Sequence, residues 1–418
     1  MADLIAAPEM LRTSDGRPLK AALAQAQKKA KWRAFFLVLP LLLFVVMTFV
    51  VPILKMLERS VYHDGFASNA PTLSAWFVAH PAGAEVDEDA YAALVADLVQ
   101  MQKAKTAGEA GTRINYTVPG TISLFKAAAR GADKLQPPFA DTLPAINKIW
   151  SNPLLWVAMR NAASAWTADF YMVSSDLKRD PDGALVRVQE NQRIYLYLFL
   201  KTFGLSVVIT VLCLVLAFPI AHLLAVLPAA KSNLLMIFVL LPFWTSLLVR
   251  TSSWIAMLQE QGILNDLMVW MGVLGDDGRV RMIYNQAGTI IVMTHILLPF
   301  MVLPLYSVMK VIPPSYARAA RSLGATSWTT FRRIYLPQTL PGIAAGSLLV
   351  FILAVGYYIT PALVGGADGQ LISNLISFHM NKANWSMAAA LAAILLGAVL
   401  ILYWLYDQLI GIDRLKFG

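Results

Sequence analysis

The stretch Pro313–Gly342, PPSYARAARSLGATSWTTFRRIYLPQTLPG, decides the fold because it is a polar segment between two long apolar runs. It carries four arginines and no acidic residue. We expect Ala317, Ala319 and Ala320 to keep one face of a short helix thin enough for close approach. Gly324 permits the turn that must follow such a helix. The stretch therefore predicts a hairpin on which a partner outside the bilayer docks.

The same stretch resembles the EAA loop of binding-protein-dependent ABC importer permeases, in which Glu-Ala-Ala is followed by a glycine and then by Ile-x-Leu-Pro. The matching residues are Ala319, Ala320, Gly324, Ile334, Leu336 and Pro337. Arg318 stands where the family carries its glutamate, and Ser322 stands at another position that is usually acidic. A basic cytoplasmic loop would explain the arginines but not this spacing.

The resemblance implies an ATPase-coupling role for Arg318 and the matching residues. The docking helix is expected over about Ser315–Leu323, and Pro337 is expected to end the segment that follows Gly324.

The composition places the chain in a membrane. Hydrophobic residues make up 58% of it and charged residues 14%, whereas soluble domains are about a quarter charged. A bilayer core needs about 20 apolar residues per helix. Runs of that length are Ala34–Leu54, Thr202–Leu227, Asn233–Val249 with a continuation to Leu258, Ala287–Met309, Leu340–Val364 and Met387–Tyr406. We therefore predict an all-α membrane protein with six transmembrane helices.

Charge sets the expected orientation. The first apolar run begins after residue 33 and lacks a signal-peptide exit, so it is interpreted as an uncleaved span. The basic residues before it are Arg12, Arg17, Lys20, Lys28, Lys29, Lys31 and Arg33, against Asp3, Glu9 and Asp15. This excess predicts a cytoplasmic amino terminus, and six crossings return the carboxyl terminus to the cytoplasm.

The expected domains follow from these spans. They are a basic cytoplasmic tail over 1–33, a first transmembrane helix over 34–56, a periplasmic insertion over 57–194, a five-helix core over 195–412 that includes the coupling hairpin 313–340, and a cytoplasmic tail over 413–418. Within the tail, Leu19–Phe35 is either a basic helix on the lipid headgroups or disordered. The insertion is expected to be mostly helical, with apolar faces over Asp87–Lys105 and Thr142–Trp166. Docking of a periplasmic partner is a hypothesis for its role.

Several kinds of chemistry find no support in the sequence. The single cysteine, Cys213, lies in an apolar run, and the five histidines lack the spacing of a zinc site. No GxxxxGK[ST] or GxSxG pattern occurs. The chain is therefore expected to be a non-catalytic subunit without a cofactor of its own, with ATP and Mg bound by a separate ATPase. The net charge of +9 suits contact with membrane lipid, and no nucleic-acid partner is expected.

Three further segments resemble the spermidine/putrescine branch of the permease family: Leu240–Asn265, Leu298–Pro314 and Phe351–Gly366. In the last of these the family often carries an acid where this chain has Tyr357. Tyrosine and tryptophan faces attract ammonium groups. The residues proposed for the translocation pathway are Trp244, Tyr357, Tyr358 and Thr360. Trp254 is a further candidate, with packing or an interfacial belt as the alternative.

Three polar residues in or beside the spans have two interpretations each. Arg250 either reaches the interface, or pairs with Glu260 or Asp266, or stabilises a gate. His222 and His295 are interpreted as members of interhelical hydrogen bonds, with a functional role as the alternative.

Together the resemblance implies one half of the channel of a type I ABC importer in a bacterial inner membrane. Its partners would be a second homologous permease, two copies of an ATPase subunit and a periplasmic solute-binding protein. The alternatives are a secondary transporter, which the scarcity of charge in the spans disfavours, and a membrane sensor or scaffold. The cargo stays open among spermidine, putrescine, another organic cation and an amino-acid-derived solute.

Overall fold

The computed structural model describes residues 19–81, 83–180 and 184–410. It divides into two units, Met1–Glu58 and Arg59–Gly418, which are taken in turn. Of the expected tails, residues 1–18 and 413–418 lie outside the described residues.

The first unit is a long helical segment. It consists of α1 (Leu19–Val45), a π-helical turn η1 (Val46–Val50) and the start of α2 (Val51–Val61). The π turn lies directly before Pro52, whose ring excludes an ordinary hydrogen bond to the preceding turn, so the wider ladder accommodates it. Leu19–Phe35 is therefore helical, and the apolar side chains of the predicted first span are mostly exposed within this unit.

The insertion opens the second unit and consists mainly of short helices. Its helices are α3 (Pro71–Ala79), α4 (Glu88–Ala104), α5 (Ala107–Ile114), α6 (Thr121–Gly131), α7 (Phe139–Ile146), α8 (Pro153–Ala162) and α9 (Asp169–Ser174). The short turns are η2 (Ala132–Lys134), η3 (Lys148–Ser151) and η4 (Glu190–Gln192). Two strands, β1 (Leu177–Arg179) and β2 (Leu185–Arg187), pair antiparallel with Lys178 opposite Val186.

The insertion has its own core. Phe66, Leu73, Phe125 and Trp150 are fully buried among the helices α3 to α8. The helix expected over Asp87–Lys105 is present as α4, with the Asp87 carboxylate accepting from the backbone N–H of Ala90 at 2.9 Å.

The helical pattern expected over Thr142–Trp166 is divided among shorter elements. That segment divides into α7, η3 and α8. Asn152 ends the short turn and caps α8, and Pro153 occupies its first position, so a new helix starts there.

The base of the insertion is fastened to the core. The backbone N–H groups of His63 and Thr167 donate to the carbonyls of Ala165 and Val61, which closes the two ends of the insertion. Asp176 then accepts from the first backbone N–H groups of the helix that begins at Tyr195, with Leu196 at 2.8 Å. This buried carboxylate caps the entry to the membrane core.

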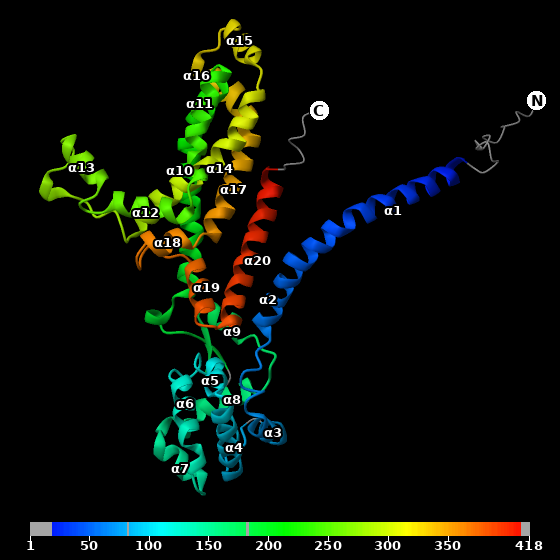
Figure 1. Cartoon of the computed structure of the whole chain (residues 1–418), viewed down its shortest axis with the longest axis vertical. Coiled ribbons are helices and arrows are strands. Elements are labelled where there is room, and N and C mark those ends of the chain that lie inside the picture. The colour runs from blue at the N-terminus through cyan, green and yellow to red at the C-terminus, as the bar shows by residue number, and fades with distance from the viewer. Residues whose placement is uncertain (1–18, 82, 181–183, 411–418) are drawn as a thin grey trace, which may run out of the picture. The chain divides into compact units, whose positions relative to one another are not determined.

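The rest of the second unit forms the membrane core. Its elements are α10 (Tyr195–Val226), α11 (Ala229–Leu240), η5 (Leu241–Trp244), α12 (Leu247–Leu258), α13 (Ile263–Trp270), η6 (Asp276–Gly278), α14 (Gln286–Val311), α15 (Pro314–Ser322), α16 (Ser327–Thr330), η7 (Phe331–Tyr335), α17 (Leu336–Gly356), α18 (Ile359–Val364), α19 (Ile372–Asn381) and α20 (Trp385–Ile410). In Figure 1, α15 and α16 lie at one end of the bundle formed by α10, α14 and α17, and the insertion helices lie beyond its other end.

Helices α10, α14 and α17 pack closely against one another. Cys213, Met301 and Val350 are fully buried in their shared core. Gly342 permits the close approach of α17 to α14, because a Cβ there would lie 3.1 Å from the carbonyl oxygen of Pro304. The apolar side chains of these three spans thus pack together into a three-helix core.

Among the described residues, five helices are long and apolar enough to cross a membrane, or six if one bent pair counts as a single span. That pair, Ala229–Trp244 and Leu247–Leu258, bends by 98°, so the continuous span expected over Asn233–Leu258 is wrong. Pro242 lies at the start of the short 3-10 turn η5, which begins at Leu241, and Ser246 caps α12 by accepting from the backbone N–H of Val249.

The span expected over Leu340–Val364 is also shorter than predicted. Its helix ends at Gly356, and α18 starts after a break at Tyr357 and Tyr358. Side chains of α19 donate hydrogen bonds to the carbonyls that the break leaves without helical partners. Ser373 donates to the carbonyl of Tyr357, and Asn374 donates to that of Tyr358 at 2.8 Å.

Candidate functional site

The hairpin predicted from the sequence begins with α15. Pro314 occupies the first turn, where its missing N–H costs nothing. The helix ends at Ser322, and Gly324, two residues further on, has a φ of +84°. The backbone N–H of Gly324 donates to the carbonyl of Arg321, and that of Ala325 donates to the carbonyl of Ala320, both at 3.0 Å. These two bonds form a Schellman end, which needs a residue in the left-handed region and explains the glycine.

The two sides of α15 differ. Ala317 and Ala320 are half-buried on the side toward α16 and η7, against which α15 packs. Arg318, Ala319 and Gly324 are exposed. The expectation that all three alanines share one thin face is therefore wrong for Ala319, since a spacing of two residues turns the helix by about 200°.

The second arm of the hairpin is continuous with the next span. Thr326 caps α16 by accepting from the backbone N–H of Thr329 at 3.2 Å. The π-helical turn η7, which contains the half-buried Ile334, leads into α17, where Leu336 is half-buried and Pro337 is exposed. Pro337 lies in the first turn of α17, so the expectation that it ends this segment is wrong. As at Pro52, the π turn before it accommodates the proline ring.

Aromatic and polar contacts brace this arm against α10. The hydroxyl of Tyr335 and Nδ1 of His222 form a hydrogen bond of 2.8 Å. The rings of Phe331 and Phe218 meet edge to face, with centroids 5.9 Å apart. The interhelical hydrogen bond predicted for His222 is confirmed. It lies between the hairpin arm and the second span of the chain.

The bend between α11 and α12 is held by Arg250. Its guanidinium donates to the carbonyls of Pro242 and Thr245, the second at 3.0 Å. The predicted pairing of Arg250 with Glu260 or Asp266 is wrong, because Asp266 instead accepts from Arg279 at 2.7 Å. A guanidinium matches unpaired carbonyls at a helix break, and this use requires no carboxylate.

His295 of α14 joins the same region. The indole N–H of Trp254 in α12 donates to Nδ1 of His295 at 3.0 Å, which confirms the interhelical hydrogen bond predicted for this histidine. His295 and Pro242 also line an otherwise apolar cavity of about 330 Å³ between α10, α11 and α14. The sequence reasoning missed His295 as a cavity residue, although a histidine inside a span was the available signal.

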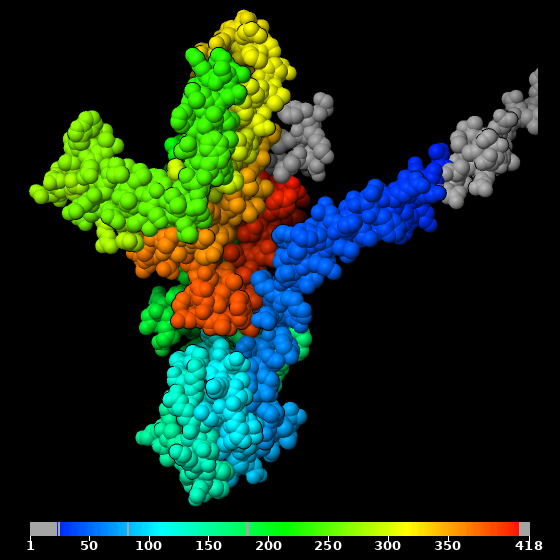
Figure 2. Space-filling model, in the orientation of Figure 1, coloured from blue at the N-terminus to red at the C-terminus, as the bar shows by residue number. Residues whose placement is uncertain are grey.

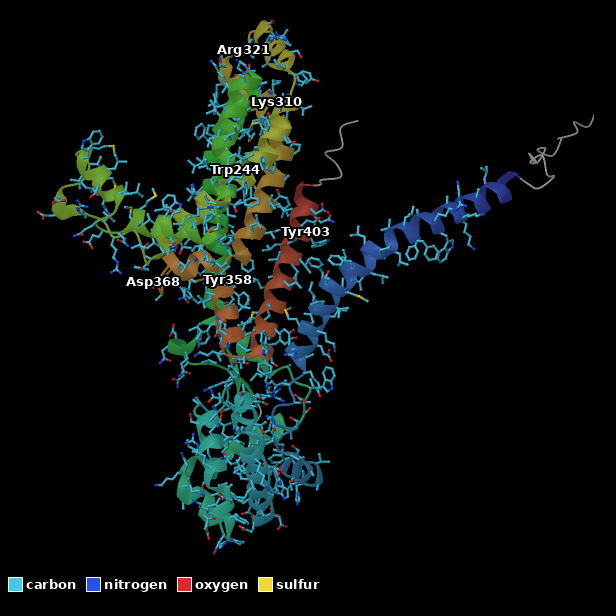
Figure 3. The ribbon with its side chains drawn as sticks, in the orientation of Figure 1. Trp244, Lys310, Arg321, Tyr358, Asp368 and Tyr403 are labelled. Atoms are coloured by element: carbon cyan, nitrogen blue, oxygen red, sulfur yellow. The ribbon has the colours of Figure 1, made fainter. Side chains whose placement is uncertain are left out.

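The four proposed pathway residues lie at the two helix breaks. Trp244 ends the 3-10 turn η5 and is 73% exposed, and Tyr358 is also exposed. Tyr357 is half-buried, and Thr360 is fully buried with its hydroxyl unpaired. In Figure 3, Tyr358 and Asp368 lie at a similar height in the view, and Trp244 lies above them on the way to the hairpin residue Arg321. The structure thus places these four residues at breaks in the helices. Among the described residues, the four do not line one enclosed cavity together.

The side chains that commonly bind metal ions are scattered over the described residues. Within the part of the chain that is described, no three side chains of His, Cys, Asp and Glu converge as they would around a metal ion. Cys213 is buried and donates weakly to the carbonyl of Thr294 at 3.4 Å, consistent with packing.

Comparison with known proteins identifies the family. Residues 217–410 match the family described as the binding-protein-dependent transport system inner membrane component. The chain is 38% identical, over 222 residues, to the spermidine/putrescine transport system permease protein PotB of Salmonella typhimurium (strain SL1344), a match that covers 52% of this chain and 77% of that protein. The chain belongs to this family of transport permeases.

Two further matches are more distant. The inner membrane ABC transporter permease protein YdcU of Escherichia coli (strain K12) is 33% identical over 218 residues, which cover 50% of this chain and 69% of that protein. A solved bacterial alginate ABC transporter, in complex with an alginate pentasaccharide-bound periplasmic protein, aligns with a TM-score of 0.44 at 20% identity, over 71% of this chain and 99% of the other.

Family membership confirms the permease predicted from the hairpin motif. The permease is a multi-pass inner-membrane subunit of an ABC importer, and ATP hydrolysis belongs to a separate ATPase subunit. The family also implies a periplasmic binding protein as a partner. The insertion over residues 57–194 lies outside the residues 217–410 on which the family is recognised.

Proposed function

We propose that this permease forms half of the translocation path for a polyamine such as spermidine or putrescine. The observation that carries the substrate class is the 38% identity to the spermidine/putrescine permease PotB. The exposed aromatic faces of Trp244 and Tyr358 are compatible with an ammonium cargo, since such faces attract cations by about 0.5–2 kcal/mol. The path has no carboxylate at Tyr357, so the binding protein would supply most of the selectivity.

The proposed assembly contains this permease, a second homologous permease, two ATPase subunits that bind ATP and Mg, and a periplasmic solute-binding protein. Its amino and carboxyl termini and the hairpin would face the cytoplasm. The insertion would then face the periplasm, because the hairpin and the insertion helices lie at opposite ends of the α10, α14 and α17 bundle (Figure 1). The arginines of the hairpin support this orientation.

The proposed path runs along the two broken helices. Trp244 lies at the first break, and Tyr357, Tyr358 and Thr360 lie at the second. Irregular backbone inside a membrane is tolerated where it lines a cavity or is buried in protein. Arg250 would hold the first break in its bent form through the carbonyls of Pro242 and Thr245.

Coupling would pass through α17. This helix starts at the hairpin, immediately after η7, and ends at Gly356, immediately before the second break. A helix of 21 residues is about 30 Å long and transmits displacement without absorbing it. Movement of α15 by an ATPase would therefore reach Tyr357 and Tyr358 at the far end. The bond from Tyr335 to His222 would carry part of the same movement to α10.

The test is uptake of labelled spermidine and putrescine by vesicles that contain the purified permeases and ATPase, with the binding protein added. The proposal predicts uptake that requires both ATP and the binding protein and persists after an ionophore has collapsed all ion gradients. Uptake that stops with the ionophore and ignores ATP would indicate a secondary transporter. ATP-driven uptake of a different solute, with neither polyamine transported, would refute the substrate class alone.

A further inference from the structure

The hairpin carries an uncompensated positive charge. Arg318, Arg321, Arg332 and Arg333 supply it, and the sequence has no acidic residue between Lys310 and Gly366. Arg318, Arg332 and Arg333 are exposed, as is Arg321 for the most part. None of the ion pairs among the described residues involves any of these four. In Figure 2 the yellow surface of this hairpin forms the end of its unit and is not covered by other segments on the face shown.

The exposed side of α15 has a particular shape. Arg318 and Ser322 are four residues apart and therefore neighbours on one side of the helix, opposite the half-buried Ala317 and Ala320. Ser315 and Ala319 also lie on the outer side, and the exposed Arg318 and Arg321, three residues apart, are the long side chains at one edge of it. A close-fitting protein surface can approach such a helix until the guanidinium itself is buried.

Apolar side chains lie at the other edge of the exposed side, about 140–160° around the helix axis from Arg318. Leu323, at the end of α15, is 89% exposed, and Tyr316 is 53% exposed. A large apolar side chain flanking a basic helix is typical of a protein interface with a desolvated centre. Fluid lipid headgroups would attract the arginines but would require neither the small residues around Arg318 nor the end position of Leu323.

We propose that α15 docks into an acidic cleft of the ATPase subunit, in which a carboxylate binds Arg318 and an apolar pocket takes Leu323. A guanidinium buried without a partner is costly, whereas its planar fork pairs with a carboxylate through two hydrogen bonds. The proposal rests on the proposed coupling function and adds the chemistry of the partner surface. The charge on Arg318 makes the contact specific, and Leu323 and Tyr316 supply apolar area.

Two measurements on the assembled transporter test separately whether α15 contacts the ATPase and whether a carboxylate of the ATPase binds Arg318. In the first, a photoreactive phenylalanine analogue replaces Leu323, and the crosslinked product is identified by mass spectrometry. In the second, binding of the purified ATPase to the permease in nanodiscs is measured for wild type, Arg318→Glu, Arg318→Gln and Arg332→Glu at several salt concentrations. Arg332 is an exposed arginine of η7 outside α15 and serves as the matched control.

The expected result is a crosslink from position 323 to the ATPase and a loss of ATPase affinity of roughly tenfold or more in Arg318→Glu. Arg318→Gln should lose less affinity and depend less on salt than wild type, and Arg332→Glu should change affinity by less than about threefold. Replacing a carboxylate near the crosslinked ATPase segment by lysine should restore the binding of Arg318→Glu.

Two outcomes overturn the proposal in distinguishable ways. A crosslink to the ATPase with unchanged or tighter binding of Arg318→Glu would refute the acidic cleft while the coupling function stands. Crosslinks to lipid alone, with ATPase affinity unaffected by either Arg318 variant, would refute the coupling function as well. Thermal unfolding of each variant confirms that the permease is folded.

Discussion

Trp254 donates its indole N–H to Nδ1 of His295 at 3.0 Å, and this bond joins α12 to α14. An indole nitrogen is only a donor, so Nδ1 must be the unprotonated nitrogen of the ring, and a neutral His295 carries its proton on Nε2. His295 also lines the cavity between α10, α11 and α14. The bond therefore fixes the tautomer and orientation of a polar side chain at a cavity wall.

Replacing Trp254 by phenylalanine should weaken both the fold and transport. Trp254→Phe removes the donor and leaves Nδ1 of His295 without its partner, which costs about 1–3 kcal/mol. We expect a lower Tm of the purified permease and slower uptake. Trp270→Phe is the control, because Trp270 is 82% exposed on α13. Equal behaviour of the two variants would show that the bond to His295 has no role.

Gly324→Ala should impair coupling through backbone strain alone. The φ of Gly324 is +84°, and a Cβ there would meet nothing within 4 Å, so the cost of about 1 kcal/mol comes from the conformation and not from a clash. Gly397→Ala is the matched control, because a Cβ there also has open space and the φ of Gly397 lies outside the left-handed region. We expect reduced binding-protein-stimulated ATP hydrolysis in Gly324→Ala only. Wild-type hydrolysis in that variant would contradict the importance of the Schellman end.

Asp176 should be the most sensitive residue at the entry to α10. Its carboxylate accepts from three backbone N–H groups, and its own φ is +56°. Asp176→Ala loses the cap and keeps the strained backbone, so we expect a destabilisation of about 2 kcal/mol or more. Asp176→Asn keeps one acceptor oxygen and tolerates this φ, so it should lose clearly less. The order of the two Tm values checks the prediction, and a reversed order would contradict it.

The insertion should lose stability below neutral pH because of His63. Burial and the nearby positive charge of Arg113 lower the pKa of His63 below 6.5, and Asp64 opposes this shift only in part. Below pH 6.5 the unfolded chain therefore binds more protons at this position than the folded chain does. Stability is complete above that pH and falls as the pH drops through the lowered pKa.

Thermal unfolding of the full-length permease at about pH 7.5 and pH 5.5, followed by tryptophan fluorescence, measures this effect. His63→Asn should show a smaller difference between the two pH values than wild type, since it removes the titrating group. An identical pH dependence in His63→Asn and wild type would assign the effect to other groups.

The sequence predicted regular elements well and helix breaks poorly. The docking helix expected over Ser315–Leu323 is α15, because its proline start and glycine end are local signals. The break after Gly356 lies where Gly356 and Pro361 favour an interruption of the helix, but the partners of its carbonyls, Ser373 and Asn374, belong to a distant helix. The bend after Leu240 had a local signal in Pro242 and Ser246, but the apolar run on both sides outweighed it.

For polar side chains in the spans, the sequence predicted the kind of interaction but not the residue that serves as partner. His222 and His295 were expected to form interhelical hydrogen bonds, and they do, but nothing in the sequence indicates Tyr335 and Trp254 as their partners. Pairing with an acid is one of the interpretations given for Arg250, but its guanidinium binds backbone carbonyls that only the bend between α11 and α12 exposes. A hydrogen-bond partner that exists only because the backbone is irregular cannot be predicted from hydrophobic periodicity or motif spacing.

The central claim is that the hairpin is a cytoplasmic docking element, and labelling of Leu323→Cys tests it most directly. Leu323 is 89% exposed, and the native Cys213 is buried, so a membrane-impermeant maleimide should report on position 323 alone. Without the ATPase, we predict labelling in inside-out vesicles and none in intact spheroplasts, and addition of the ATPase should protect the cysteine. Labelling in intact spheroplasts would place the hairpin outside the cell and contradict the account.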